Sequence, residues 1–249
     1  MNLLIAAAAT RRRMNVIKRT GPGPTTLQAG NNEWGFYGEL PTLISQTALA
    51  AAIGLTGTVG SVLNESPGWF KFNAKGKTLF VPKRPLRSNV TWYDFYKLGA
   101  VYGSDDNGAA PPKTRPGVVQ NARVTIGTDV FRVRLMKGFS EDPFTDSQGG
   151  LTRQEIKDGE YCRLILPMLA DAQVGQTGGD WANYTHTDLG IVNAGARQIV
   201  QEAGTGTDAA NEPYRFYLGR SLDTNYAYFI GYDTRAASSG WRPVLELIT

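Results

Sequence analysis

Two residue types that occur only once limit the chemistry open to this chain. The 249-residue sequence contains a single histidine, His186, and a single cysteine, Cys162. One histidine excludes an HExxH zinc site and a two-histidine iron site, and it leaves a catalytic triad one candidate base. One cysteine can form no disulfide within the chain. We interpret His186 as a loop histidine and Cys162 as a buried small apolar residue.

Carboxylates are the remaining residues that could carry catalysis, and they gather in loops. One pair is Asp105 and Asp106, and a second group is Glu141, Asp142 and Asp146. A glycosidase needs two acids about 5 to 9.5 Å apart across a sugar, whereas acids in loops commonly form solvated turns. The order of these acids also differs from a calcium-binding EF-hand loop. A glycan hydrolase and a Ca²⁺ site therefore stay alternatives, and we predict no catalytic residue, no metal ligand and no cofactor.

Nucleotide and nucleic-acid motifs are missing from the sequence. It contains no GxxxxGK[ST] loop, no GxGxxG that opens a helix after a strand, and no GxSxG elbow. Residues 1–140 carry a net charge of +11 and residues 141–249 a net charge of −7. Because no nucleic-acid-binding motif accompanies the basic half, we expect contacts with other subunits or proteins and no nucleic-acid binding.

The N-terminal apolar run is not typical of an export signal or a membrane span. It is followed by the basic cluster Arg11–Arg13, whereas a signal peptide has its positive charges first. The run is also shorter than the roughly 20 residues that cross a bilayer. We expect neither an export signal nor membrane insertion.

The composition favours many short elements joined by tight turns. Hydrophobic residues make up 41% of the chain, which contains 29 glycines and 13 prolines, and charged residues make up only 19%. Such a chain can bury a sizeable core but is not typical of long charged helices. We predict an α+β protein of short strands with two or more short helices.

Local patterns place most of these elements. Hairpins are predicted around the turns Lys75–Gly76 and Gly127–Thr128, because alternating apolar runs flank both. Thr91 is a predicted helix cap and Gly99 a predicted helix end. Further predicted elements are a short helix within 43–53 and strands over 197–201, 214–219, 226–232 and 241–248. The stretch from Thr152 to Met168 is predicted to form two short elements or one helix that breaks, because Gly159 and Pro167 interrupt it.

Residues 1–66 differ in texture from the rest of the chain. They contain an alanine run, the arginine cluster and a Gly-Pro-Gly-Pro stretch at residues 21–24, which cannot continue a helix. The short apolar pieces around that stretch cannot build a core alone. We therefore predict an extended N-terminal arm over 1–66 that anchors the chain on a neighbouring subunit or protein, and a domain over 67–249.

Five segments carry a family resemblance. They are PGWFKFNAKGKTLFVPKRPLRSNVTWYDFYKLGAVYG, DVFRVRLMKG, GEYCRLILPML, GDWANYTHTDLG and GWRPVLEL. In this order they resemble virion structural proteins of tailed bacteriophages, over residues 67–247. The resemblance implies a C-type-lectin-like domain in which the terminal strands pair and the loops before the last strands form a display surface.

The resemblance also implies a role and a set of residues. It implies a noncatalytic component of the phage particle, assembled in the host cytoplasm. The expected role is a tail, fibre or baseplate protein for host-surface attachment, and the alternative is a capsid decoration or head-fibre protein. A homo-oligomer, with a trimer as the specific expectation, other virion proteins bound through residues 1–66, and a host surface glycan or protein are the expected partners.

Two sets of residues follow from this interpretation. Display residues are expected in 204–213 and 222–239, because Asn, Asp, Ser, Gly and Tyr in loops suit adaptable contacts. The candidate receptor contacts are Asp223, Asn225, Tyr226, Tyr232 and Asp233. The candidate fold-defining residues are Trp69, Trp92, Trp181, Trp241, Arg242 and Pro243. Among these we expect Trp241 to fill the core and Arg242 to pair with a carboxylate.

Overall fold

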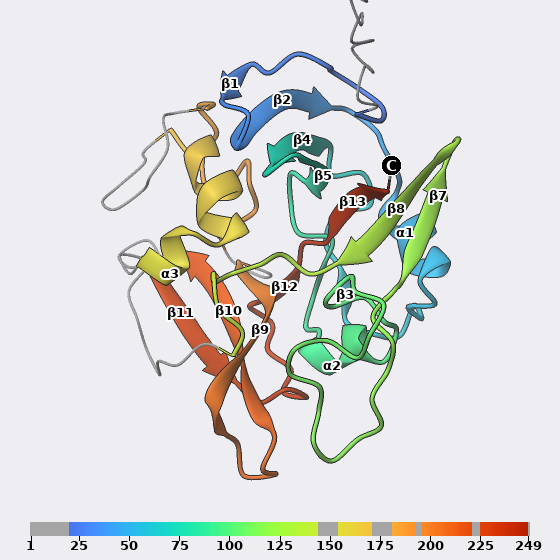
Figure 1. The fold of residues 1–249 in the computed structure, drawn as a ribbon, viewed down its shortest axis with the longest axis vertical. Helices are drawn as coiled ribbons and strands as arrows, with labels where there is room; N and C mark the ends of the chain where they lie inside the picture. Colours follow the sequence, from blue (N-terminus) through green and yellow to red (C-terminus); the bar gives the residue numbers. More distant parts are fainter. Residues whose placement is uncertain (1–19, 144–153, 171–180, 193–195, 221–224, 249) are drawn as a thin grey trace, which may run out of the picture.

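Two β-sheets organise the chain in the computed structural model, which describes residues 20–143, 154–170, 181–192, 196–220 and 225–248 (Figure 1). The first sheet has the order β1 (Ala29–Gly30), β2 (Trp34–Leu40), β4 (Trp69–Ala74), β5 (Lys77–Pro82), β13 (Val244–Ile248), β8 (Asp129–Arg134) and β7 (Arg123–Ile126). The second has the order β11 (Asn225–Ile230), β10 (Pro213–Arg220), β9 (Arg197–Thr207), β12 (Ser239–Trp241), β6 (Arg87–Ser88) and β3 (Ser61–Val62).

Few and short helices complete the fold. They are α1 (Gln46–Ala52), α2 (Trp92–Tyr96), α3 (Gln154–Lys157), a π-helical turn η1 (Tyr161–Ile165) and a 3-10 turn η2 (Leu166–Met168). The chain is therefore a mixed α+β protein built mostly of sheet. No helix within the described part of the chain is both long enough and apolar enough to cross a membrane.

Both predicted hairpins are confirmed. In the β4–β5 hairpin Lys75 and Gly76 occupy the turn with φ of 49° and 81°, and left-handed backbone at both central residues matches the twist of a two-residue hairpin. In the β7–β8 hairpin Ile126 pairs with Asp129 across a turn whose Gly127 has a φ of 62°. Local sequence alone determines these two units.

The predicted helix signals also hold. Thr91 Oγ1 accepts a hydrogen bond from Asp94 N at 3.0 Å, and Thr91 N donates to Asp94 Oδ2 at 2.9 Å, which forms a capping box at the start of α2. Gly99 follows the helix with a φ of 70°. The stretch that ends at Met168 is broken into α3, η1 and η2, as Gly159 and Pro167 predict. Its expected cap, Thr152, lies outside the described residues.

The sequence predicts one C-terminal strand over 241–248, whereas the structure has two strands there, β12 and β13. β12 ends at Trp241 in the second sheet and β13 begins at Val244 in the first, where it pairs with both β5 and β8 (Figure 1). Arg242 and Pro243 carry the chain from one sheet to the other. Proline lacks an N–H, so a sheet crossover is a position where it costs no ladder hydrogen bond.

The structure corrects the prediction of an extended arm for residues 20–66. β2 pairs along β4 from Trp34↔Ala74 to Leu40↔Trp69, and β3 pairs with β6. Leu49 and Leu55 lie in the same core cluster as Trp69. The apolar pieces of this segment bury themselves on the hairpin and on α2, so no break between packed units occurs at residue 66. Residues 1–19 lie outside the described residues.

A buried lysine helps to hold this segment. The side chain of Lys71 on β4 is fully buried, and its Nζ donates to Pro24 O at 2.6 Å and to Thr20 Oγ1 at 3.2 Å. Burial lowers the pKa of Lys71 to about 8. Residues 20–24 are thus attached to β4 of the first sheet by hydrogen bonds from the Lys71 side chain.

Candidate functional site

The two sheets meet at a seam where Leu135 and Met136, which follow β8, lie beside β9. Met136 and Val200 form an isolated parallel bridge, and Gln201 N donates to Met136 O at 3.1 Å. The side chain of Gln201 adds a second link, because its Nε2 donates to Leu135 O at 2.8 Å. Backbone and side chain together fix the position of residues that line the space beside the seam.

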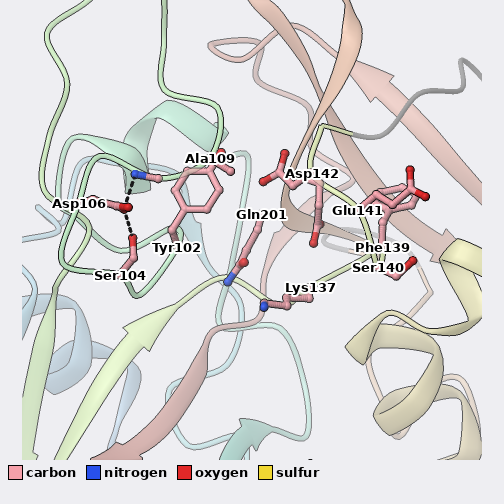
Figure 2. A pocket seen from close by; sticks show the side chains of 12 residues that line it. Tyr102, Ser104, Asp106, Ala109, Lys137, Phe139, Ser140, Glu141, Asp142 and Gln201 are labelled. Atoms are coloured by element: carbon pink, nitrogen blue, oxygen red, sulfur yellow. Dashed lines mark hydrogen bonds between the residues drawn. The ribbon is translucent and has the colours of Figure 1, made fainter.

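A cavity of about 320 Å³ opens beside this seam, and we name it the acid pocket (Figure 2). It is lined by Tyr102, Ser104, Asp106, Gly108, Ala109, Lys137, Phe139, Ser140, Glu141, Asp142, Gln201 and Glu202. In Figure 2 the loop of residues 102–109 lies on one side and residues 139–142 lie on the other, with Gln201 and Lys137 between them. Three segments distant in sequence therefore build one cavity.

The loop side of the acid pocket is shaped by Asp106. Its Oδ1 accepts hydrogen bonds from Ser104 Oγ at 2.6 Å and from Gly108 N at 2.8 Å, and these bonds lower the pKa of Asp106. Gly108 has a φ of 83°, and a Cβ there would lie 2.0 Å from the ring of Tyr102. Only glycine lets the loop close onto the tyrosine.

A buried arginine supports this loop from behind. The guanidinium of Arg215 lies 3.6 Å from the centre of the Trp92 ring, and its Nη2 donates to Ala110 O at 2.7 Å. Its Nη1 donates to the hydroxyl of Tyr102 at 3.4 Å. Burial raises the pKa of the Tyr102 phenol, so the residue stays a neutral hydrogen-bonding group. The loop wall is thus held by the core and does not depend on a ligand.

Asp142 and Glu202 form the acidic side of the pocket. Glu202 Oε2 accepts from Gly138 N at 2.9 Å, and Asp142 Oδ1 accepts from Ala203 N at 3.0 Å. Burial, with the charge of Asp142 as a second cause, raises the pKa of Glu202 to about 8. Burial also raises the pKa of Asp142, against the hydrogen bond from Ala203 and the charge of Arg215. With a pKa of about 8, Glu202 is mainly protonated at neutral pH.

A second cavity, of about 460 Å³, adjoins the acid pocket. The two cavities share Lys137, Phe139 and Ser140 in their linings. The walls of the second cavity include Trp34 and Lys75, whose Nζ lies 5.5 Å from the centre of the Trp34 ring. We name it the basic cavity. Its lining has four basic residues, Lys75, Lys77, Arg134 and Lys137, and three acids, Glu33, Asp158 and Glu160, whereas Lys137 is the one basic residue in the lining of the acid pocket.

This arrangement can do two kinds of chemistry. A neutral acid beside a carboxylate is the pattern of glycosidase acid–base pairs, and a cavity lined by fixed acceptors can also hold a ligand rich in hydroxyl or amino groups. Among the described residues no group of three or more His, Cys, Asp or Glu side chains is arranged to hold a metal ion.

The expected receptor contacts are placed in three ways. Asp223 lies outside the described residues, and Asn225 and Tyr226 lie on β11 with side chains outside the description. Asp233 is exposed and forms an ion pair with Arg115. Tyr232 is only 6% exposed, and its hydroxyl accepts from Arg115 Nε at 3.0 Å. Its ring packs edge-on against Tyr93, so Tyr232 belongs to the core and not to a display surface.

The expected fold-defining residues lie mainly in the core. Trp69, Trp92 and Trp241 are fully buried, as expected, and Trp241 stacks on Phe95 with ring centres 5.0 Å apart. Trp181 is half-buried near Phe72, and Pro243 is buried at the sheet crossover.

The prediction that Arg242 pairs with a carboxylate is wrong. Its guanidinium is buried and donates to the backbone oxygen of Leu189, and no carboxylate pairs with it among the residues that the structure describes. Burial lowers its pKa to about 10. The single cysteine agrees with its interpretation, because Cys162 is buried and burial raises its pKa to about 12.

Sequence reasoning considered three acids of the acid pocket, Asp106, Glu141 and Asp142, but it missed Glu202 and did not bring these acids together. Asp142 was one of the loop acids considered for a hydrolase, whereas Asp105 forms exposed ion pairs with Arg123 and Arg132, and Asp146 lies outside the description. Glu202 follows the predicted strand 197–201 directly, and nothing in its neighbours marks it. Only the isolated bridge between Met136, which follows β8, and Val200 of β9 brings it near Asp142.

Comparison with known proteins adds no relative. No family model matches the chain, and neither a curated protein nor a solved structure matches it.

Proposed function

We propose that the chain is a noncatalytic structural protein of a tailed-bacteriophage particle, with a lectin-like domain that takes part in host-surface attachment from a tail, fibre or baseplate. In this proposal the fold is the scaffold and the acid pocket is the contact site. The display residues expected on the last strands are replaced by the loops 102–109 and 137–142, because Tyr232 is buried.

The observation that carries the proposal is how the resembling segments pack. β13 pairs with β5 and with β8, and Leu86 N donates to Trp241 O at 2.8 Å. Tyr161 N of η1 donates to Lys137 O at 3.2 Å. Segments from four separate stretches thus form one framework, and within residues 67–249 the closing strand pairs with the first hairpin. This supports a lectin-like arrangement of terminal strands.

A capsid decoration or head-fibre protein is the second candidate. The charge difference between residues 1–140 and 141–249 favours it, because a net +11 on one part suits contact with an acidic shell. In that case the same framework would serve only as a cap, and the acid pocket would have no ligand.

Labelling of the intact particle tests the proposal. Antibodies raised against the purified chain, detected with gold beads on particles in the electron microscope, are expected to mark the tail or its fibres. Labels on the capsid would favour the decoration protein, and particles without label, with the chain absent from purified virions by mass spectrometry, would overturn both candidates.

A further inference from the structure

The acid pocket has more hydrogen-bond acceptors than donors. Carboxylates of Asp106, Glu141 and Asp142 line it, and the charged donor among its lining residues is Lys137. Gln201 also lines it, but its amide nitrogen already donates to Leu135 O. A ligand that satisfies such a cavity must bring donors of its own, and its charge must be positive or neutral.

The acceptors are fixed before any ligand arrives. Ala203 N holds Asp142 Oδ1, Gly138 N holds Glu202 Oε2, and Ser104 and Gly108 hold Asp106. Each carboxyl group is thereby oriented through one oxygen by backbone or loop hydrogen bonds. Groups that need no reordering lose less conformational entropy on binding.

We infer that the acid pocket binds a saccharide that carries a free amino group, with the ammonium placed against Asp142 and hydroxyl groups on the remaining acceptors. This inference rests on the proposed attachment function and names the chemical class of its ligand. The saccharide extends past Lys137 and Ser140 into the basic cavity, where Lys75 donates to its ring or hydroxyl oxygens. Together the volumes of about 320 and 460 Å³ lie in the range of ligand sites.

Two features favour a saccharide over a simple amine. A second cavity adjoins the acid pocket, since Phe139 lines both, and the walls of the two include the half-buried rings of Tyr102 and Trp34 beside polar groups. Charged hydrogen bonds are the stronger ones, so the amino group anchors the ligand and the hydroxyls align it. A compact amine would leave the basic cavity unused.

Calorimetry with purified full-length chain at pH 7 tests the inference. The probe is a glucosamine tetrasaccharide with free amino groups, and the comparison ligands are its fully N-acetylated form and a glucose tetrasaccharide. Binding of the free-amine form at least about tenfold tighter than either comparison ligand is expected, which corresponds to one charge-assisted hydrogen bond. Equal binding of all three, or no binding of the free-amine form, would overturn the inference.

Variants locate the binding. Asp142→Asn keeps an oxygen for Ala203 N and is expected to weaken binding about tenfold, whereas Asp233→Asn, at an exposed acid outside the pocket lining, is expected to change nothing. Glu141→Gln, on the exposed rim, cannot unfold the core and is expected to weaken binding about twofold to threefold. An Asp233→Asn loss equal to that of Asp142→Asn would place the ligand elsewhere.

The same ligands separate this inference from the proposed function. If gold labels mark the tail but the free-amine tetrasaccharide does not bind, attachment stands and the ligand class is wrong. If the sugar binds but no label appears on particles, the site stands and the virion role is wrong. Hydrolysis of the tetrasaccharide, followed by chromatography of the products, would overturn the noncatalytic assignment while leaving the ligand class in place.

Discussion

Two clusters of buried charge lie on either side of Lys137, and they are built in opposite ways. On the side of the basic cavity, Arg134 binds Glu160 through both Nη atoms at 2.7 Å and Glu246 through Nε at 3.0 Å. On the side of the acid pocket, burial raises the pKa of both Asp142 and Glu202, the charge of Asp142 adds to the shift of Glu202, and neither acid forms an ion pair within the described residues.

The difference separates a structural site from a candidate functional site. Burial works to raise the pKa of Glu246, but Arg134 and Lys77 hold it below its ordinary value, so the network is a paired and charged one. The two acids of the acid pocket, Asp142 and Glu202, instead keep raised pKa values, and both line a cavity. Strained titratable groups beside a cavity are typical of binding and catalytic sites, whereas satisfied networks are typical of structural ones.

Breaking the paired cluster has the largest expected effect. Arg134 is only 2% exposed, and Arg134→Met leaves Glu160 buried without its cation and Glu246 with Lys77 alone. We expect the free energy of unfolding to fall by about 3 to 5 kcal/mol, the range for a buried pair that loses one partner. Urea unfolding followed by tryptophan fluorescence measures the loss.

Lys77 supplies the matched control in the same network. Its Nζ lies 2.7 Å from Glu246 Oε1, but its side chain is 60% exposed. Lys77→Met is expected to cost less than about 1 kcal/mol, because water replaces the ammonium. Equal losses for the two variants would mean that burial does not distinguish the members of this network.

The local units of the fold could be predicted from the sequence, and the long-range pairing could not. Lys75–Gly76, Gly127 and the Thr91–Asp94 box act within a few residues, so their signals are visible in a short window. The pairing of Leu40 with Trp69, by contrast, joins two apolar pieces across a helix and a glycine-rich loop. A short apolar piece shows that it must be buried, but not against which strand.

The same limit explains the missed site. Asp142 and Glu202 are separated by 60 positions, and they meet only because Met136 bridges Val200. A loop acid that forms a solvated turn and a loop acid that lines a cavity have the same local sequence signals. Charge and cysteine counts could exclude types of site, but the contact between the segment after β8 and β9 was needed to locate a candidate site.

In the acid pocket, removal of an ionisable group is expected to raise the free energy of unfolding, whereas removal of Arg134 lowers it. Between the ordinary pKa of 4.5 and the folded-state value of about 8, folded Glu202 keeps a proton that the unfolded chain releases. The contribution of Glu202 to stability is therefore complete below pH 4.5 and lost as the pH rises through about 8. Glu202→Gln keeps an acceptor for Gly138 N and cannot ionise.

We therefore expect the free energy of unfolding of Glu202→Gln, relative to that of the parent chain, to rise by on the order of 4 kcal/mol between pH 5 and pH 9. Urea unfolding at pH 5, 7 and 9 measures the difference between the two chains. Lys71, whose pKa burial lowers to about 8, adds its own pH dependence above pH 8, but it is common to both chains and cancels. A difference that stays constant with pH would contradict an ionising buried acid.

Removal of the second acid has the smallest expected effect and tests the coupling itself. The charge of Asp142 is the second cause of the raised pKa of Glu202, after burial. Asp142→Asn removes that charge and leaves the burial, so the pKa of Glu202 is expected to fall by less than about one unit and to stay above its ordinary value. Titration of the carboxyl carbons by NMR measures it, with Asp233→Asn as the control at an exposed acid. A pKa of Glu202 unchanged in Asp142→Asn would mean that the two acids do not share a site. An ordinary pKa of Glu202 in the parent chain would mean that water reaches its carboxyl group. In that case the acid pocket and the Arg134 cluster would differ less than their hydrogen bonds indicate.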